Sequence, residues 1–415
     1  MKPPVSIFRF HEEQKDVHWL YNINQEQDWN DSRVFPSIQD HSQMEMIIQQ
    51  EQQMIFLSRP DDTLMFRHNP DECFISYLQG HGIEIPVIRR ISDTNSLPWS
   101  DMRHGRKTLL VPYIVNEAIC AEAYHNAVSV YGSDPFLVKR FNDKFQTRRL
   151  AAEIGFNLTK GDFCTNEREL IQTYRMLREQ GFEKTVLKVP FGSSGKGMRI
   201  IKDETSFTQM LQFIGRRRKD FELLLEGWHP IKRSMNCQLL IEAGRVTILG
   251  ITEQKIDEYG IYLGSDFTPS YEKAVLNSYS DSMMKLGNRL MEMGYSGIAG
   301  VDSIIDDKDE LIPVIEINAR FTQVTYLLPL VWRLRQQHRY VLSRFIRGES
   351  AVSYGFDEIC AAMTRNASGG SFLIYNFAKA VHAGKSVYRI FFLVYGNDLE
   401  TVERTMHRLE QFSFM

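Results

Sequence analysis

The sequence lacks the cysteine patterns that build disulfide frameworks or zinc sites. Its five cysteines are odd in number, widely scattered and never arranged as a CxxC pair. A disulfide framework is typical of short secreted chains with an even number of cysteines, and zinc sites typically contain CxxC pairs. We therefore expect free core thiols at all five positions, which are Cys73, Cys120, Cys164, Cys237 and Cys360.

The chain also has no long apolar run and no strong excess of one charge. Nothing approaches the ~20 apolar residues of a membrane-spanning helix, and the proline-containing start reaches Glu12 without the apolar stretch of a signal peptide. Lysine and arginine total 49 against 52 acidic residues, a net charge of -3. A global attraction to nucleic acid or anionic membranes is therefore excluded, and we expect a cytoplasmic protein that binds neither.

Apolar residues, by contrast, are plentiful at 43% of 415 residues, with 12% aromatics. A chain of this length and composition predicts two or three packed domains. Strand and helix patterns alternate, so we expect an α/β (α+β) fold. We predict an N-terminal α/β domain over 1–135, a central catalytic domain over 136–335 and a small C-terminal module over 336–415.

The element pattern is clearest in the central region. A helix is predicted over 143–154, because an acidic residue begins the amphipathic segment and Gly155 ends it. Further helices are predicted over 166–180, 204–218, 270–294 and 325–347. Predicted strands cover 185–190, 198–202, 222–226, 237–242, 245–251, 298–305 and 311–317. Near the C-terminus we predict a strand over 388–395 and a helix over 398–412.

A glycine-rich loop lies between the first two of these strands. It runs from Pro190 to Met198, and its glycines allow backbone N–H groups to approach a phosphate. The spacing differs from the GxxxxGK[ST] phosphate loop, and an ordinary hairpin turn is the alternative. Lys188 precedes the loop in an apolar strand, where an ammonium is costly without a negative partner. A nucleotide phosphate is such a partner.

The predicted strands 298–305 and 311–317 carry the second polar cluster. Glu316, Asn318 and Arg320 occur at alternate positions and therefore share one face. If the hairpin turns near Asp309, Asp302 lies opposite Glu316 on that face. Two carboxylates and an amide oxygen suit Mg²⁺. A buried polar network or a set of surface pairs is the alternative, with Arg320 as a counterion.

Taken in order, these elements resemble the ATP-grasp carboxylate ligases. The matching set is Lys144, Lys188, the loop from Gly192 to Gly197, Glu226 in LLLEGWHP, Asp302 and the segment Glu316 to Arg320. The resemblance implies an ATP-grasp fold with an N-terminal pre-ATP-grasp domain. In that family the segment matching Glu226 to His229 is the hinge of the nucleotide site. The sequence departs from many family members in the strand after this hinge, where it has Asn236 and Gln238 in place of a glutamate.

The resemblance also implies roles for individual residues. Lys144 and Lys188 would contact ATP phosphates, the loop would fold over them, and Arg320 would stabilise the transferring phosphate. Asp302, Glu316 and Asn318 would hold Mg²⁺ or Mn²⁺. The nucleotide-binding set implied for the loop and the hinge is Gly192, Ser193, Ser194, Gly195, Lys196, Gly197, Glu226, Gly227 and Trp228.

The implied activity is ATP-dependent activation of an amino acid carboxylate as an acyl phosphate. The acceptor would be an amine or the thiol of an acyl-carrier protein. The overall layout is similar to amino-acid ligases of pheganomycin-type peptide-antibiotic assembly and to the glutamate to acyl-carrier-protein ligase of butirosin biosynthesis. A small-molecule kinase and a non-catalytic nucleotide-binding protein are the alternatives, and a homodimer is one oligomeric state we consider.

Overall fold

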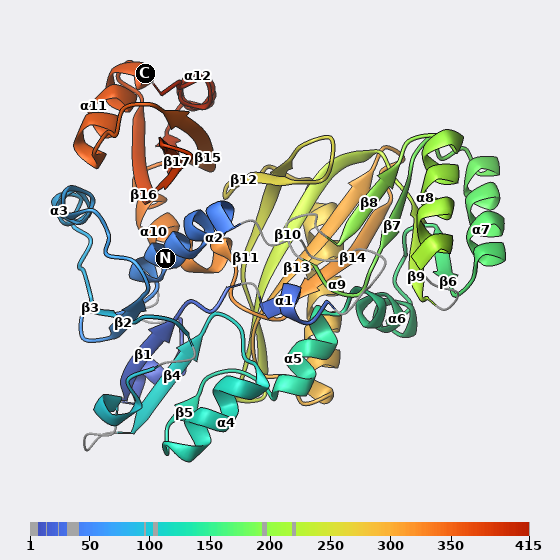
Figure 1. Cartoon of the computed structure of the whole chain (residues 1–415), viewed down its shortest axis with the longest axis horizontal. Coiled ribbons are helices and arrows are strands. Elements are labelled where there is room, and N and C mark those ends of the chain that lie inside the picture. The colour runs from blue at the N-terminus through green and yellow to red at the C-terminus, as the bar shows by residue number, and fades with distance from the viewer. Residues whose placement is uncertain are drawn as a thin grey trace.

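The computed structural model describes residues 7–13, 15–23, 25–30, 41–94, 97–102, 107–192, 197–217 and 221–414. Within them the chain forms a five-stranded, a four-stranded and an eight-stranded sheet with helices packed around them (Figure 1). No helix in this part of the chain combines the length and the apolar character needed to cross a membrane.

The N-terminal sheet is parallel, with strand order β3-β2-β1-β4-β5. Its strands are β1 (Asp16–Leu20), β2 (Thr63–Phe66), β3 (Val87–Arg90), β4 (Thr108–Pro112) and β5 (Ser129–Val130). All of β4 is buried, as expected of a parallel strand covered on both faces. The helices are η1 (Arg9–Glu12), α1 (Gln25–Asp28), α2 (His41–Ile48), η2 (Gln49–Phe56), α3 (Glu72–Gly80), η3 (Trp99–Met102), α4 (Glu117–His125) and α5 (Pro135–Asn142).

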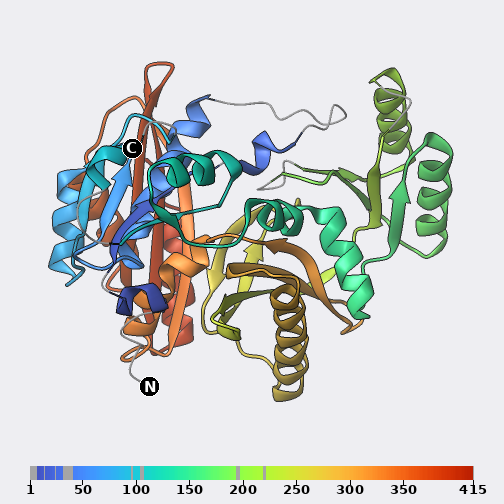
Figure 2. The same ribbon diagram turned by 90° about the horizontal axis from the view of Figure 1, so that it is seen from below.

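The four-stranded sheet forms a separate unit at one end of the molecule (Figures 1 and 2). Its order is β6-β9-β7-β8, and all residues of the two central strands are buried. Leu170 and Leu177 of α7 help to form the apolar core of this unit. The elements are β6 (Gly161–Cys164), α7 (Glu167–Glu179), β7 (Thr185–Lys188), β8 (Met198–Ile201), α8 (Glu204–Arg217) and β9 (Leu223–Gly227).

The eight-stranded antiparallel sheet has the order β14-β13-β10-β11-β12-β15-β17-β16. This sheet therefore contains strands from both sides of the domain boundary predicted at residue 335. The division of the chain into three domains stays a prediction. The strands of this sheet are β10 (Ile231–Glu242), β11 (Arg245–Ile256), β12 (Tyr262–Asp266), β13 (Gly297–Asp306), β14 (Leu311–Asn318), β15 (Tyr340–Ser350), β16 (Ser371–His382) and β17 (Lys385–Gly396). The accompanying helices are α9 (Lys273–Glu292), α10 (Gln323–Leu334), α11 (Phe356–Ala367) and α12 (Leu399–Glu410).

Helix α6 (Lys144–Ile154) confirms the helix predicted over 143–154. The Asp143 side chain accepts hydrogen bonds from the backbone N–H groups of Phe145 and Gln146, at 2.7 and 3.2 Å. Gly155 ends the helix with a φ of 82°, a left-handed conformation that glycine adopts at little cost. These two caps fix where Lys144 begins the helix beside the glycine-rich loop.

The helix predicted over 325–347 is wrong in its second half. Helix α10 ends at Leu334, and Tyr340–Ser350 is strand β15, paired along its length with β17. The polar segment from Gln336 to Arg339 interrupts the helical pattern, and the following residues alternate across the sheet as strand residues do. The strand predicted over 388–395 and the helix over 398–412 are confirmed by β17 and α12.

Strand β16 is the edge of the large sheet, and two glutamines of η2 satisfy its backbone. Gln49 bonds with both the N–H and the carbonyl of Lys379, at 3.0 and 2.8 Å. Gln52 does the same with Phe377, at 3.0 and 2.9 Å. These side-chain amides cover an exposed edge and attach the N-terminal region to the C-terminal strands.

Candidate active site

An open cleft lies between the four-stranded sheet and the strands β10, β11, β13 and β14. Its apolar side chains are Val186, Met198, Ile231, Ile256, Ile304 and Ile315. Its hydrogen-bonding and charged side chains include Thr159, Lys188, Glu226, Trp228, His229, Ser234, Gln254, Asp302, Ser303 and Glu316. Apolar walls with a few converging charged groups are typical of a ligand site.

Lys188 lies on this cavity wall, but it already has a carboxylate partner. Its Nζ is 2.6 Å from Glu226 Oε2 on the neighbouring strand β9. Arg148 Nη1 on α6 is 2.5 Å from the other oxygen, Glu226 Oε1. Burial opposes the charge of Glu226, but Lys188 and Arg148 outweigh it and hold its pKa below the usual value. Glu226 is therefore an ionised partner of two cations, of which Lys188 lines the cavity.

Gly227 and Trp228 follow Glu226 at the edge of the cavity. Their backbone N–H groups donate to the carbonyls of Lys160 and Lys184, at 2.8 and 2.9 Å. A side chain at Gly227 would lie 2.5 Å from the Phe182 ring, so the strand end requires glycine. Both N–H groups therefore donate to carbonyls of the protein. The contact of this segment with the base of a nucleotide stays a prediction.

His229 fixes the position of the same segment. Its Nε2 accepts the Lys160 backbone N–H at 3.1 Å, and its Nδ1 is 3.6 Å from Asp306 Oδ2. Burial lowers the pKa of His229, although Asp306 acts in the opposite direction. An accepting Nε2 requires the neutral tautomer that carries its proton on Nδ1.

Asp302 and Glu316 are direct partners in the β13 and β14 register, as the sequence predicts. Three amide groups converge on Asp302: Asn236 and Gln254 donate to Oδ1 at 2.8 Å, and Asn318 donates to Oδ2 at 3.1 Å. Burial and the charge of Glu316 raise the pKa of Asp302 to about 6. Two carboxylates this close favour a bound cation.

The oxygen-rich donor set fits Mg²⁺ better than metals that need several protein ligands. In the part of the chain that the structure describes, no group of three or more His, Cys, Asp or Glu side chains could hold a metal. Mg²⁺ usually keeps waters and takes one or two carboxylates together with substrate phosphates. Asp302 and Glu316 supply that number. Asn318 directs its amide nitrogen to Asp302 and its oxygen to Arg320, so its role as a ligand stays a prediction.

Lys144 connects the metal-binding candidates to the glycine-rich loop. Its buried Nζ donates to Glu316 Oε1 and to the Gly192 carbonyl, both at 2.8 Å. Gly192 has a φ of 145°, which other residues rarely adopt, and a side chain at Gly197 would lie 2.9 Å from the Phe191 carbonyl oxygen. Ser193, Ser194, Gly195 and Lys196 lie outside the described residues.

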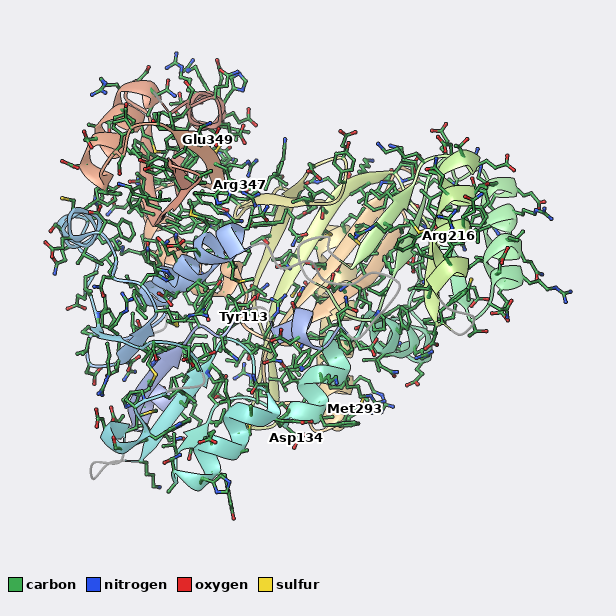
Figure 3. All side chains as sticks on the ribbon, viewed as in Figure 1. Tyr113, Asp134, Arg216, Met293, Arg347 and Glu349 are labelled. Carbon is green, nitrogen blue, oxygen red and sulfur yellow. The ribbon has the colours of Figure 1, made fainter. Side chains whose placement is uncertain are left out.

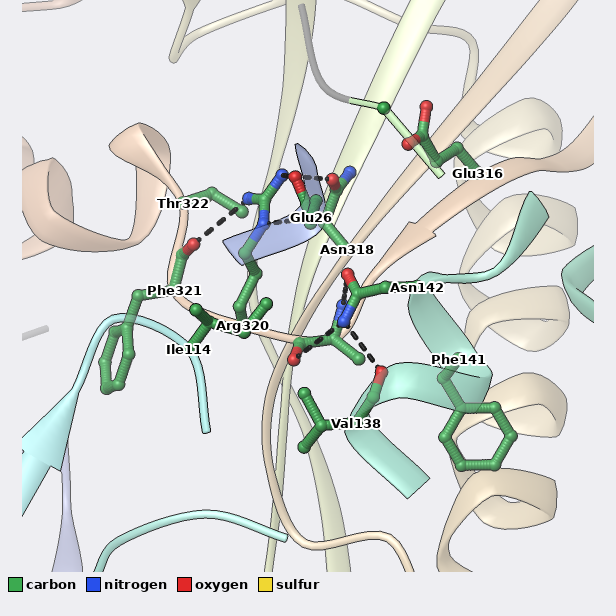
Figure 4. Close-up of polar contacts among 12 residues, drawn as sticks. Glu26, Ile114, Val138, Phe141, Asn142, Glu316, Asn318, Arg320, Phe321 and Thr322 are labelled. Atoms are coloured by element: carbon green, nitrogen blue, oxygen red, sulfur yellow. Dashed lines mark hydrogen bonds and ion pairs between the residues drawn. The ribbon is translucent and has the colours of Figure 1, made fainter. Parts of the chain in front are cut away.

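Arg320 follows β14 and is held mainly by the N-terminal region (Figure 4). Its Nε and Nη2 donate to the Glu26 carboxylate at 2.7 and 3.2 Å, and Nη2 also donates to Asn318 Oδ1 at 2.8 Å. The guanidinium lies 5.2 Å from the Tyr113 ring centre. Burial disfavours its charge, but Glu26 and Tyr113 outweigh this effect and raise the pKa of Arg320.

Asn142 supports the same segment from α5. Its Oδ1 accepts the Ala319 backbone N–H at 3.0 Å, and its Nδ2 donates to the Val138 carbonyl at 2.8 Å, as Figure 4 shows. The Ala319 backbone is therefore tied to α5, and the Arg320 side chain is tied to α1 through Glu26.

Several polar residues of the site escape the sequence-based prediction. Arg148 lies four residues after Lys144, and that helical spacing places both on one face of α6, a signal that could have found it. Asn236 pairs with Asp302 across β10 and β13, which only the observed register reveals. Gln254 and Glu26 give no local signal, because they reach the site from β11 and from α1.

Comparison with known proteins identifies the class. A sequence model described as the ATP-grasp domain of L-aspartate--L-methionine ligase matches residues 184–318. The chain is 36% identical over 403 residues to the [butirosin acyl-carrier protein]--L-glutamate ligase of Niallia circulans, covering 96% of this chain and 95% of that protein. The chain therefore belongs to the ATP-grasp ligase family, and it is an ATP-binding ligase.

Solved structures agree on the fold. An ADP complex of N5-carboxyaminoimidazole ribonucleotide synthetase has a TM-score of 0.61 at 11% identity and covers 95% of this chain and 96% of its own. Biotin carboxylase from Campylobacter jejuni has a TM-score of 0.54 at 11% identity, over 94% of this chain and 90% of its own. These likenesses confirm the α/β ATP-grasp fold expected from the sequence.

Proposed function

We propose that the protein uses Mg-ATP to convert the carboxylate of an amino acid into an acyl phosphate and then joins the acyl group to a nucleophile. The observation that carries this proposal is the in-register pair Asp302 and Glu316, which faces the same cavity as Lys188. A site that gathers two carboxylates and a lysine suits a metal-bound polyphosphate.

The proposed reaction has two balanced steps. A carboxylate oxygen of the amino acid bonds to the γ-phosphorus of ATP while the bond from that phosphorus to the β,γ-bridging oxygen breaks, releasing ADP. The acceptor nucleophile then bonds to the carbonyl carbon, its proton is lost and inorganic phosphate leaves. Phosphorylation is needed because a free carboxylate has no adequate leaving group.

The side chains have separate tasks in this scheme. Lys144 and Lys188 neutralise phosphate oxygens, while Arg320 stabilises charge that develops on the acyl phosphate and on the tetrahedral adduct. Bound Mg²⁺ or Mn²⁺ would neutralise the β- and γ-phosphate oxygens, with Asp302 and Glu316 as its protein ligands and Asn318 as a further candidate. The catalytic effect rests on positioning and charge neutralisation, and no protein nucleophile is required.

For the substrates, we propose glutamate as the donor and an acyl-carrier-protein thiol as the acceptor. The support is the 36% identity, along almost the whole chain, to a ligase named for joining L-glutamate to the butirosin acyl-carrier protein. A role in antibiotic biosynthesis belongs to the same proposal. An amine acceptor, which would yield an amide in place of a thioester, is the alternative within this class.

Incubation with Mg-ATP, individual amino acids and hydroxylamine tests the proposal directly. Hydroxylamine traps an acyl phosphate as a hydroxamate whatever the natural acceptor is. We expect a hydroxamate with glutamate, together with ADP and phosphate in equal amounts. AMP and pyrophosphate as the main products would contradict an acyl phosphate, and phosphorylation of a hydroxyl compound without hydroxamate would favour the kinase alternative.

A further inference from the structure

A row of buried hydrogen bonds leads from the start of helix α10 to Asp302. Thr322 and Thr325 begin this helix as a capping box, in which each hydroxyl oxygen accepts the backbone N–H of the other residue, at 3.1 and 3.2 Å. Their hydroxyl groups donate to Gln238 Oε1 at 2.9 and 2.6 Å. The helix start therefore turns the oxygen of Gln238 toward α10 and its nitrogen away from it.

Two amides carry this direction on to the carboxylate. Gln238 Nε2 donates to Asn236 Oδ1 at 2.8 Å, and Asn236 Nδ2 donates to Asp302 Oδ1 at 2.8 Å. Gln238 is 0% exposed and Asn236 is 2% exposed, so water does not compete for these hydrogen bonds. An ionised carboxylate only accepts hydrogen bonds, which requires the same orientation of both amides from the other end of the row.

Gln254 of β11 approaches the same carboxylate oxygen. Its Nε2 donates to Asp302 Oδ1 at 2.8 Å, and its Oε1 accepts the Ser234 hydroxyl at 3.3 Å. The strands that carry these residues, β13, β10 and β11, are neighbours in the large sheet. The side chains of Asn236, Gln238 and Gln254 thus form an amide cluster beside Asp302, and two of them donate directly to Oδ1.

The amide cluster determines which oxygen of Asp302 can bind a cation. A carboxylate has about four lone-pair sites, roughly two on each oxygen. Asn236 and Gln254 fill the sites of Oδ1, and Asn318 Nδ2 takes one site of Oδ2 at 3.1 Å. Among the residues that the structure describes, no further group donates to this carboxylate. The site that remains for a cation is therefore on Oδ2.

We propose that the amide cluster is a set of positioning residues, which hold Asp302 so that Oδ2 alone binds the metal ion of a metal-nucleotide complex. The proposal rests on the metal site of the proposed function and assigns a role to side chains that act through Asp302. Mg²⁺ demands nearly octahedral geometry, so a carboxylate with a fixed direction binds it better than a mobile one. Neutral donors suit this task, because an acid at these positions would repel Asp302.

Binding of Mn²⁺ and ADP tests this role without turnover. Electron paramagnetic resonance measures free Mn²⁺, and calorimetry measures ADP affinity with Mn²⁺ and with a chelator in its place. We expect Gln238→Met and Asn236→Leu to weaken Mn²⁺ binding in the presence of ADP by roughly 10- to 100-fold, the range that partners of metal ligands contribute. Their affinity for ADP without metal should stay unchanged. Gln254→Met, at a half-buried position, should weaken Mn²⁺ binding in the same way and tests the proposal if the two buried variants do not fold.

The matched control is Gln52→Met, which removes a buried amide far from the metal site. Gln52 makes two hydrogen bonds to the backbone of Phe377 on β16. The strands β15 to β17, on which Figure 3 labels Arg347 and Glu349, form the opposite end of the large sheet from β13. This variant should lose stability as Gln238→Met does, but it should keep the Mn²⁺ affinity of the wild type.

Two results would overturn the proposal. Wild-type Mn²⁺ affinity in the folded variants of the amide cluster would show that Asp302 needs no support, and equal losses of ADP affinity with and without metal would make the cluster structural. Neither measurement needs an amino acid, so both are independent of the hydroxamate assay. Metal-dependent ADP binding without any hydroxamate would contradict the proposed function alone. A wild type that binds ADP equally well with and without Mn²⁺ would contradict the metal site, and this proposal with it.

Discussion

Glu26 and Arg320 are joined by two hydrogen bonds of 2.7 and 3.2 Å, although they are 294 residues apart in the chain. Their side chains are only 11% and 9% exposed, so this ion pair is largely shielded from water. Glu26 belongs to α1 of the N-terminal region, whereas Arg320 follows β14. The N-terminal region thus orients Arg320, the arginine that we propose to stabilise the transferring phosphate.

We expect Glu26→Gln to lower the stability of the ligand-free protein, because it leaves the Arg320 charge without its carboxylate. Removing one partner of a buried ion pair costs roughly 3 to 5 kcal/mol. Thermal unfolding measures the loss, and saturating Mg-ATP should recover part of it by supplying a new anion. Glu400→Gln, which breaks an exposed pair with Arg404, is the control and should leave Tm unchanged. An unchanged Tm in Glu26→Gln would show that the pair contributes little.

Lys188 and Arg320 should differ in which step they affect. Lys188→Met should weaken ATP binding by roughly 10- to 100-fold, because its phosphate contact exists in the ground state. The fold should persist, since Glu226 keeps its bond to Arg148. Arg320→Lys should mainly lower kcat, because a lysine lacks the planar donor pair needed as charge develops. Calorimetry for ATP and steady-state kinetics separate the two effects. Similar losses of ATP affinity in both variants, at unchanged kcat, would contradict this division.

The sequence predicts the hairpin at the centre of the site because period-2 spacing and turn position together determine register. Asp302 faces Glu316 as expected, since a one-residue slip would bury the charged face in place of the apolar one. Helix α6 is equally predictable, because Asp143 and Gly155 mark its ends through local bonds. These features depend on residues close together in sequence.

The features that the sequence misses depend on long-range packing. Strand β15 is confused with a continued helix because its 11 residues are specified by pairing with β17 and not by local propensity. Glu26 cannot be found from sequence for the same reason, since its partner lies in another part of the chain. The Arg148 contact to Glu226 links α6 to β9 and also requires the folded arrangement.

Glu51 lies outside the candidate site, and it should make the stability of the protein depend on pH. Burial raises the pKa of Glu51 to about 7, even though the backbone N–H groups of Arg67 and His68 donate to its carboxylate. An unfolded glutamate titrates near pH 4.3, so folding takes up a proton between about pH 4.5 and 7. The contribution of Glu51 to the free energy of unfolding should therefore fall as pH rises through this window, by roughly 3 kcal/mol at most.

Denaturant unfolding of wild type and Glu51→Gln from pH 4 to 8 measures this contribution. The difference in unfolding free energy between the two proteins should change between about pH 4.5 and 7 and stay constant at higher pH. Glu72→Gln, which replaces an exposed acid of α3, serves as the control. Parallel stability curves for wild type and Glu51→Gln would assign the pH dependence to other groups.

Glu316→Gln distinguishes a metal ligand from a structural ion-pair partner. Glu316 bonds to Lys144 at 2.8 Å and, together with burial, its charge raises the pKa of Asp302. If Glu316 binds Mg²⁺, the variant should stay folded, because the loss of one negative charge relieves the repulsion between positions 302 and 316. Lys144 also keeps its hydrogen bond to the Gly192 carbonyl. Activity should fall roughly 100-fold or more, with partial rescue by excess metal, because an amide is a weaker Mg²⁺ ligand than a carboxylate.

The structural alternative predicts the opposite pattern for the same variant. Loss of its carboxylate partner would leave the buried Lys144 ammonium with only a carbonyl, at a cost of roughly 3 kcal/mol and several degrees in Tm. Melting curves with and without Mg-ATP, beside the hydroxamate assay, separate the two cases. Glu310→Gln, in the exposed turn of the same hairpin, is the matched control and should change neither quantity. A destabilised Glu316→Gln that keeps near-normal activity would remove Glu316 from the metal site, and Asp302 alone could not hold Mg-ATP as we propose.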